Sequence, residues 1–143
     1  MDLRVVELGT DKVGKTWFVG IQLLSSDSLT PFTAVNFFVF PNRNYHKRRE
    51  VTFEFGCGVS IRDSSKSCAK IEDLVVPERL ENRGIGSLLL SFVEVWLRQQ
   101  CVREIHGKLN EADSGHYDKL EYFYKKHGYS FDVAKREIRK ILN

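Results

Sequence analysis

The sequence has few cysteines and no long apolar run, and these two absences exclude several classes of protein. Its three cysteines, Cys57, Cys68 and Cys101, are widely spaced among 143 residues, so neither a disulfide framework nor a metal-binding pair emerges. No apolar run approaches the roughly 20 residues of a membrane-spanning helix. The opening residues MDLRVVELGT lack the basic and apolar regions of a signal peptide. We therefore expect a cytoplasmic protein with no metal and no membrane partner.

An excess of one charge is also missing. The chain has 22 Lys and Arg residues against 19 Asp and Glu residues, a formal net charge of +3. One dense basic stretch, NRNYHKRRE at residues 42–50, is typical of a solvated loop, although it could also attract an anionic substrate or nucleic acid. We expect no nucleic acid partner. With no repeat, linker or low-complexity segment, the length fits one domain over residues 1–143.

The first half of the chain has the composition of β-strands. β-Branched and aromatic residues are concentrated in five runs, which turn-like clusters such as SSDSLTP separate. The runs span residues 3–8, 16–24, 34–40, 51–61 and 69–76.

The second half changes to helical spacing. A wide apolar face begins after Gly84 and continues to Leu97. Residues 103–109 then read as a strand, and a second helix begins near Asp113 or Ser114 and stops at Gly128. The tail, residues 131–142, fits either a strand or a short helix. These elements predict an α/β fold of the α+β type, with a mostly antiparallel N-terminal sheet followed by a β–α–β–α unit.

Two stretches resemble phosphate-binding loops. GTDKVGKT, residues 9–16, matches the pattern G-x-x-x-x-G-K-[ST], which binds phosphates only where it joins a strand to a helix. The residues after it, WFVGIQLL, favour a second strand, so we interpret this stretch as a hairpin loop. A nucleotide hydrolase using Gly9–Thr16 stays a remote alternative.

The second stretch, VVPERLENRGIGSLLLSFVEVWL at residues 75–97, has the required context. A strand precedes it and a long helix follows. Amides of a first helical turn have no intrahelical partners, and the helix dipole adds positive charge at that end. Gly84 and Gly86 would let an anion approach the backbone without meeting a Cβ. The alternative is a tight strand-to-helix turn with no ligand.

Residues 71–90, IEDLVVPERLENRGIGSLLL, resemble the acyl-CoA-binding segment of the GNAT superfamily of N-acetyltransferases, whose signature is [Q/R]-x-x-G-x-[G/A]. LEYFYKKHGY, residues 120–129, is similar to the closing helix and turn of that family. The resemblance covers about residues 68–131. It implies a GNAT-like mixed, mostly antiparallel sheet that splays around a CoA site, with acetyl-CoA as co-substrate and an amine on a small molecule, peptide or protein as acceptor.

The resemblance also implies which residues bind the coenzyme. Backbone amides in the loop would hold the diphosphate, the pantetheine arm would run along the preceding strand, and Arg79, Arg83 and Lys126 are candidates for an outer phosphate. The implied cofactor-binding residues are Leu74, Val75, Val76, Glu81, Asn82, Arg83, Gly84, Ile85, Gly86, Ser87 and Lys126.

For catalysis, the resemblance assigns a general acid to Tyr124, four residues before Gly128. A phenol with a pKa near 10 stays protonated at neutral pH and can donate to the leaving thiolate. Glu72 lies two residues before Leu74 on the same face of the strand and is the candidate base, directly or through water. The backbone amide of Val76 would hold the thioester oxyanion.

The chain departs from the family pattern in two ways. Glu81 stands at the first signature position, where the family has Gln or Arg, and Tyr117 stands where many members have Asn. The two helices that normally follow the first strand are reduced or missing, because only Thr30-Pro31 resembles a helix start in residues 10–50. A CoA-binding sensor with weak catalysis is therefore an alternative, as is an acetyltransferase acting on aminoacyl-tRNA. The apolar strands also allow a homodimer.

Overall fold

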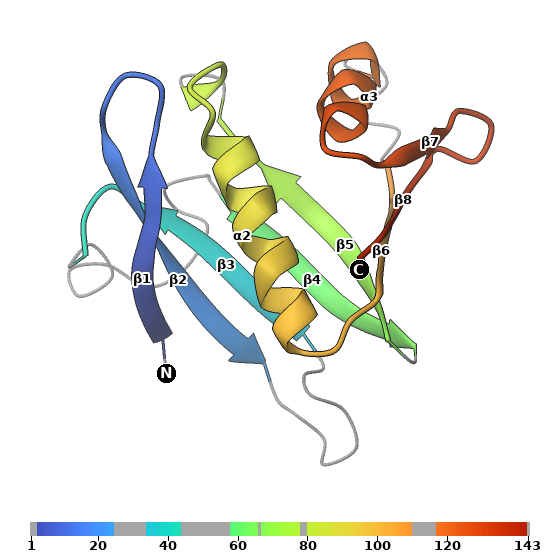
Figure 1. Ribbon diagram of the computed structural model, residues 1–143, viewed down its shortest axis with the longest axis horizontal. Coiled ribbons are helices and arrows are strands. Elements are labelled where there is room, and N and C mark those ends of the chain that lie inside the picture. The colour runs from blue at the N-terminus through green and yellow to red at the C-terminus, as the bar shows by residue number, and fades with distance from the viewer. Residues whose placement is uncertain are drawn as a thin grey trace.

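A single twisted sheet dominates the molecule (Figure 1). The computed structural model describes residues 3–24, 34–43, 58–65, 67–77, 80–109 and 117–142. Within these ranges, eight strands form one sheet in the order β1-β2-β3-β4-β5-β6-β8-β7. The strands are β1 (Leu3–Thr10), β2 (Thr16–Leu24), β3 (Ala34–Phe40), β4 (Gly58–Ser65), β5 (Cys68–Val75), β6 (Glu104–Lys108), β7 (Ser130–Asp132) and β8 (Glu137–Ile141).

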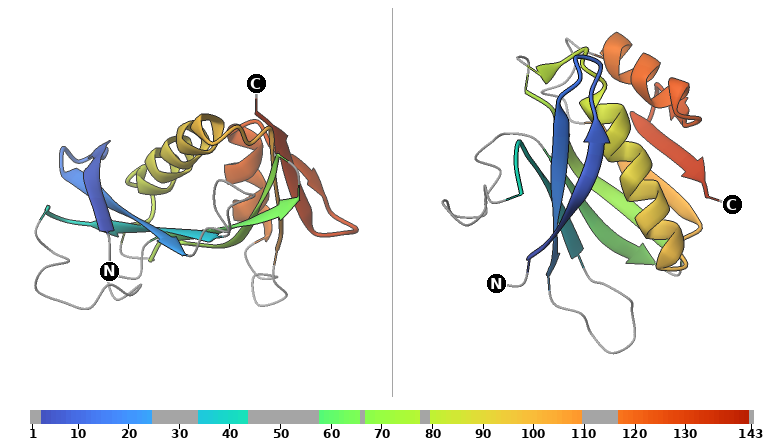
Figure 2. Two further views of the ribbon diagram at one scale, coloured as in Figure 1. Left: turned by 90° about the horizontal axis from the view of Figure 1, so that it is seen from below. Right: turned by 60° about the vertical axis from the view of Figure 1, so that its left-hand side comes forward.

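One long helix, α2 (Ile85–Gln99), covers one face of the sheet, as Figure 2 shows from below. Its apolar side chains recur at helical spacing and are buried against the inward residues of the strands. Phe37 of β3 meets the Trp96 ring edge-on, with the ring centroids 5.4 Å apart. The main buried contributors from α2 are Ile85, Leu89, Leu90, Val93, Trp96 and Leu97.

A shorter helix, α3 (Tyr117–Lys126), lies beside the C-terminal strands (Figure 1). It ends as predicted, because Gly128 follows with φ +86° and the Tyr129 N–H donates to the Tyr124 carbonyl at 3.0 Å. The predicted helix start near residues 113–114 lies outside the described residues. The ambiguous tail is a strand pair, since β7 and β8 pair antiparallel.

The sheet splays between β5 and β6, its one parallel pair within the described residues. The two strands pair from Cys68 opposite Glu104 as far as Ile71 opposite Gly107, and β5 then continues to Val75 without that partner. A Cβ at Gly107 would lie 3.2 Å from the Ile71 carbonyl oxygen, so this glycine permits the close approach where the splay begins. On the other side, the register with β4 shifts at Glu72, which makes a β-bulge.

The N-terminal half is strand-rich, as expected. β1 and β2 form an antiparallel hairpin, so GTDKVGKT joins two strands and the hairpin interpretation of residues 9–16 is confirmed. Together with the mixed sheet, this confirms the expected fold class. The described residues before α2 contain no α-helix. Thr30-Pro31, Arg79 and the basic stretch beyond Arg43 lie outside the described residues.

Candidate functional site

The start of α2 is an uncompensated helix terminus. Gly84 precedes the helix in the left-handed conformation, no side chain caps the first turn, and that turn has no acidic residue. In the part of the chain that the structure describes, the N–H groups of Ile85, Gly86 and Ser87 donate to no acceptor. Such amides, together with the helix dipole, favour an anion in front of the turn.

The two glycines of the motif have different structural surroundings. Gly84 has φ +84°, which an L side chain adopts only with strain, so it shapes the turn. Gly86 sits under a ring instead, because a Cβ there would lie 3.3 Å from Cε1 of Phe123 on α3. We expected both glycines to clear space for a ligand. Gly86 also lets α3 pack against α2, and the clearing of space for a ligand by the two glycines stays a prediction.

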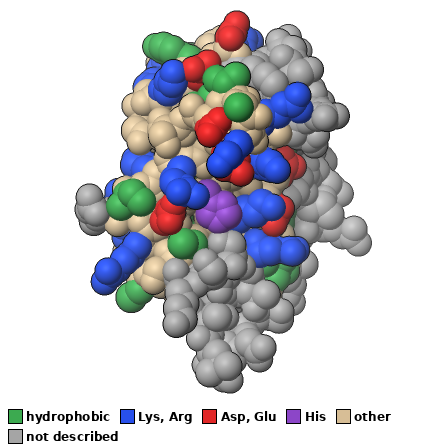
Figure 3. All heavy atoms as spheres, turned by 90° about the vertical axis from the view of Figure 1, so that its right-hand side faces the viewer, with side chains coloured by type: hydrophobic (Ala, Val, Ile, Leu, Met, Phe, Trp, Pro, Cys, Tyr) green, Lys and Arg blue, Asp and Glu red, His purple; other side chains and the backbone are tan. Residues whose placement is uncertain are grey.

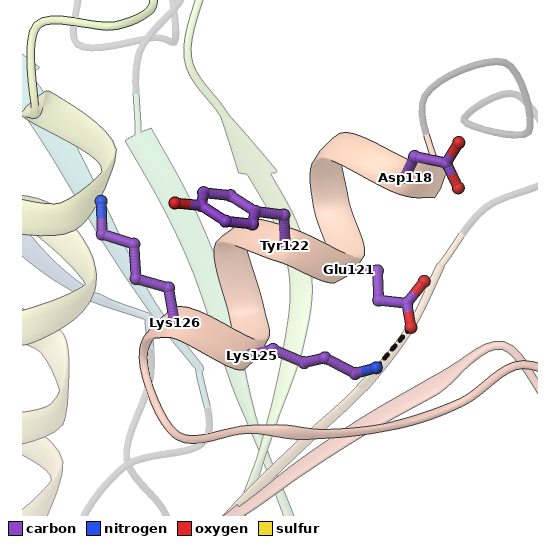
Figure 4. A pocket seen from close by; sticks show the side chains of 5 residues that line it. All are labelled: Asp118, Glu121, Tyr122, Lys125 and Lys126. Atoms are coloured by element: carbon purple, nitrogen blue, oxygen red, sulfur yellow. Dashed lines mark hydrogen bonds and ion pairs between the residues drawn. The ribbon is translucent and has the colours of Figure 1, made fainter.

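A hollow of about 340 Å³ opens in front of this turn. Three elements line it: the β1–β2 loop, the first turns of α2 and the end of α3. Figure 4 shows Lys126 extending from α3 toward α2. The lining residues are Thr10, Asp11, Lys12, Arg83, Gly84, Ser87, Leu88, Ser91, Lys126 and His127.

A larger hollow, about 510 Å³, runs along α3 itself (Figure 4). The described residues that line it all come from that one helix, and Lys125 there pairs with Glu121 at 2.6 Å. Its charged lining combines two acidic and two basic side chains, and it shares Lys126 with the smaller hollow. The smaller hollow is therefore the better anion site.

Arg83 is partly engaged within the protein. Its guanidinium contacts the buried Asp11 carboxylate at 2.8 Å and 3.0 Å, and it lies 5.7 Å from the centroid of the Trp17 ring. Burial alone would raise the pKa of Asp11. Hydrogen bonds from Trp17, from the backbone of Lys15 and Val13, and from Arg83 outweigh that effect and lower the pKa to about 2. Asp11 is thus ionised throughout the neutral range.

The other predicted loop residues take separate positions. Asn82 is exposed and has φ +63°, so two left-handed residues flank Arg83 in the turn. Glu81 points to Lys119 of α3, with 3.4 Å between the charged atoms. Lys126 is exposed and forms no ion pair among the described residues. A turn of this kind can direct successive N–H groups toward an anion.

Leu74, Val75 and Val76 lead directly into this turn. Leu74 and Val75 pair with Val59 and Gly58 of β4, whereas the described part of β6 pairs with β5 no further than Ile71. One edge of this segment therefore faces the splay. An extended chain can add to a strand edge by main-chain hydrogen bonds.

Tyr124 lies inside the protein. Its side chain is 3% exposed, and its ring meets Phe123 and Tyr129 edge-on, with centroids 5.2 Å and 5.3 Å apart. A group that received a proton from Tyr124 would have to enter the core beside these rings.

Glu72 is the extra residue of the β5 bulge. Both Glu72 and Asp73 are exposed, so the alternation of the strand breaks at this point. The Glu72 carboxylate lies 3.6 Å from Arg62 and 4.0 Å from Lys70. It is available to solvent on the same strand as Leu74.

The sequence did not reveal one polar contact of the site. Nε2 of His127 lies 2.9 Å from Oγ of Ser87, which joins the end of α3 to the first turn of α2. Burial lowers the pKa of His127, with Lys126 and Lys140 adding to that effect and Glu94 opposing it. The ring is therefore neutral at pH 7. Only its position just before Gly128, opposite the α2 loop, could have suggested the contact.

On one face of the molecule (Figure 3), the described residues form no large patch of a single charge. Figure 3 shows basic and acidic side chains mixed over the face that carries α3 and the C-terminal strands. Among the described residues, no group of three His, Cys, Asp or Glu side chains could hold a metal ion. None of the helices that the structure describes has the length and apolar character needed to cross a bilayer.

Comparisons with known proteins point to one family. A family model described as an acetyltransferase (GNAT) domain matches residues 36–131. Among solved structures, the chain is similar to Ard1 from Thermoplasma volcanium, with 19% identity, a TM-score of 0.52, and coverage of 62% of this chain and 64% of that one. It is also similar to a GNAT-family acetyltransferase from Staphylococcus aureus Mu50, with 15% identity, a TM-score of 0.59, and coverage of 77% and 69%.

A third similar structure is PaiA N-acetyltransferase from Thermoplasma acidophilum in complex with coenzyme A, with 15% identity, a TM-score of 0.56, and coverage of 77% of this chain and 62% of that one. The chain thus spans slightly less than two thirds of the Ard1 and PaiA chains. No curated protein matches the chain significantly. At these identities the structural likeness shows the fold, and the family model, which covers more than half of the chain, shows the family. The chain belongs to the GNAT family of acetyltransferases, as its two sequence motifs predicted.

Proposed function

We propose that this chain is an N-acetyltransferase that moves the acetyl group of acetyl-CoA to a primary amine on a small molecule, peptide or protein. Membership of the GNAT family supports the enzyme class, an acyl-CoA N-acyltransferase. One observation carries the coenzyme assignment: the unpaired amides of α2 open onto a hollow that also contains Lys126 and Lys12. We treat residues 1–143 as one catalytic domain, and its cytoplasmic setting stays a prediction.

In this proposal the diphosphate binds the N–H groups of residues 83–87. Asn82 and Glu81 contribute backbone at the edge of the turn, and Lys126 contributes charge. The pantetheine arm follows the open edge of β5 at residues 74–76, because that strand leads straight into the turn. The splay between β5 and β6 supports this path, since it leaves one edge of the segment without a described strand partner.

The reaction needs two proton movements. An ammonium with a pKa near 10 loses a proton before its nitrogen attacks the thioester carbonyl carbon. The C–N bond forms, the C–S bond breaks, and the departing thiolate takes a proton. We assign the donation to Tyr124 and the removal to Glu72, directly or through water, with the Val76 amide holding the oxyanion. The exposed Glu72 at the bulge supports a base that water can reach.

A CoA-binding module without efficient transfer is the second candidate, and the burial of Tyr124 favours it. A side chain that is 3% exposed is typical of a packed helix aromatic, whereas a proton donor must be reached by its acceptor. The aminoacyl-tRNA alternative depends on the basic stretch, of which the structure describes only Asn42 and Arg43.

Calorimetry and a transfer assay separate these candidates. Acetyl-CoA is titrated into the full chain, and thiol release is then followed with a panel of primary amines. Binding at one site per chain together with amine-dependent thiol release supports the enzyme. Binding with no release on any amine supports the module, and the absence of any binding overturns both.

A further inference from the structure

The loop that imitates a nucleotide-binding motif lies against the candidate coenzyme site. Residues 9–16 form the tip of the β1–β2 hairpin, and this tip docks on the segment before α2. The Lys12 N–H donates to the Arg83 carbonyl at 2.9 Å, and Asp11 pairs with the Arg83 guanidinium at 2.8 Å. The two stretches that the sequence offered as alternative phosphate loops therefore meet in space.

The tip is held in one conformation by Asp11. Its carboxylate is fully buried and accepts hydrogen bonds from the N–H groups of Val13 and Lys15, both at 3.0 Å, and from Nε1 of Trp17 at 2.8 Å. Each of these bonds is charge-assisted and therefore stronger than a neutral one. The backbone on both sides of Lys12 is thus fixed relative to the start of α2.

The Lys12 side chain crosses directly over Gly84. A Cβ at Gly84 would lie 3.5 Å from both Cγ and Cε of Lys12. The Lys12 ammonium forms no ion pair in the described ranges, and it lines the hollow together with Lys126. The one carboxylate in the lining, Asp11, is already neutralised by Arg83. The uncompensated charge of the hollow is therefore positive.

Lys15 of the same tip behaves differently. Its ammonium lies 5.2 Å from the centroid of the Trp17 ring, and it does not line the hollow. In a true nucleotide-binding loop, the lysine at this motif position would contact the phosphates. Here the hairpin aims the other lysine, Lys12, at the start of α2.

We propose that Lys12 binds a phosphate group of the coenzyme, so that the β1–β2 hairpin is a third wall of the coenzyme site beside the α2 turn and α3. This inference rests on the proposed function. The chemistry that recognises the ligand is that of a phosphate, which belongs either to the diphosphate or to the 3′-phosphate of CoA.

The test compares Lys12→Ala with Lys15→Ala by calorimetry, using CoA, dephospho-CoA and S-acetylpantetheine. Lys15→Ala is the matched control, because it removes an equal charge from the same loop. We expect Lys12→Ala to weaken CoA binding about tenfold at low salt, and the loss to shrink as salt is raised. Lys15→Ala should leave the CoA affinity within about twofold of wild type, and Lys12→Arg should restore most of it. Neither alanine variant should change the affinity for S-acetylpantetheine.

Dephospho-CoA identifies the phosphate. If Lys12→Ala weakens the binding of dephospho-CoA as much as that of CoA, Lys12 contacts the diphosphate. If Lys12→Ala binds dephospho-CoA as tightly as the wild type does, Lys12 contacts the 3′-phosphate. If the wild-type chain binds CoA and Lys12→Ala binds it with the same affinity, the assignment of Lys12 is overturned and the proposed function stands. The same conclusion follows if Lys15→Ala loses as much CoA affinity as Lys12→Ala. Absence of CoA binding by the wild-type chain overturns the proposed function and this assignment with it.

Discussion

At the scale of single residues, side chains of the same type differ in how deeply they are buried. Asp11 is a carboxylate with all its bonds made inside the protein, whereas Glu72 lies open at a bulge. Tyr124 is enclosed, whereas Tyr122, on the same helix, is 72% exposed. Burial therefore separates groups of the same chemical type, because Asp11 and Tyr124 are shielded from bulk water whereas Glu72 and Tyr122 are in contact with it.

Asp11→Asn should lose stability in a pH-dependent way. The folded-state pKa of Asp11, about 2, lies below its ordinary value of 3.8, so the ionised form stabilises the native state. That contribution is fully present above about pH 4 and disappears as the pH falls through about 2. Urea unfolding of both proteins from pH 7 down to pH 2.5 should show a difference in the free energy of unfolding that narrows below about pH 4. A difference that stays constant over this pH range would contradict this role of Asp11.

Tyr124→Phe should lower kcat about 100-fold, because loss of a general acid removes typically 10²–10⁴ in rate. Affinity for CoA should stay within about twofold, since the Tyr124 side chain does not line the hollow before α2. Thiol-release kinetics and calorimetry measure the two quantities separately. Tyr122→Phe is the control and should retain wild-type kcat. An unchanged kcat in Tyr124→Phe would remove this residue from the mechanism.

At the scale of elements, the first turn of α2 carries the ligand site. It joins the open edge of β5 to an uncapped helix terminus, and α3 and the β1–β2 hairpin each contact it. The helix leaves its positive end without an internal anion, because Gly84 has no side chain to cap the first turn and that turn has no acidic residue. A terminus left open in this way is suited to an external anion.

Gly84→Ala should lose CoA affinity by about tenfold or more, and Gly14→Ala should not. The two glycines have nearly equal φ angles, +84° and +87°, so an alanine costs a similar strain of about 1–2 kcal/mol at either position. Nothing lies within 4 Å of a Cβ at Gly14, whereas a methyl group at Gly84 would stand between Lys12 and the amides of the turn. Thermal unfolding checks the equal strain, and calorimetry checks the affinity. Equal affinity in both variants would separate Gly84 from the site.

At the scale of the whole molecule, a polar cluster ties α2 to the C-terminal hairpin. The Glu94 carboxylate, buried on α2, accepts hydrogen bonds from the Tyr129 hydroxyl at 3.0 Å and from Lys140 of β8 at 2.8 Å. Burial and the Glu94 carboxylate raise the pKa of Tyr129, so its hydroxyl stays protonated. This cluster holds α3 and the C-terminal strands against the long helix.

Glu94→Ala should therefore destabilise the fold by about 2–3 kcal/mol, because it leaves the buried Tyr129 hydroxyl without its acceptor and removes the carboxylate partner of Lys140, which retains the His127 carbonyl. Glu121→Ala is the control, since it breaks only the exposed pair with Lys125 and should cost less than about 1 kcal/mol. Urea unfolding measures both changes. If both variants lose the same free energy of unfolding, the buried cluster stabilises the fold no more than an exposed ion pair does.

Much of this architecture could be predicted from local pattern. The alternation and β-branched content of the first half predicted the strands, the spacing after Gly84 predicted α2, and Gly128 predicted the end of α3. These features depend on neighbours within a few residues, which is the range over which a single sequence carries information.

Contacts between distant segments could not be predicted in this way. Asp11 and Arg83 are 72 positions apart, and nothing in the sequence around either residue predicts that they pair. The same holds for the Phe123 ring over Gly86 and for the burial of Tyr124, which depend on how α3 packs. The candidate site residues were identified through a sequence motif. A motif does not indicate which of its residues face the ligand.

The most direct test is a titration of the ¹⁵N-labelled chain with CoA, followed through its amide resonances. The account predicts that the largest shifts belong to the N–H groups of Gly84, Ile85, Gly86 and Ser87, because those donors gain an acceptor when the phosphates bind. Saturating CoA that leaves these four resonances in place, or that shifts only resonances elsewhere in the chain, would contradict it.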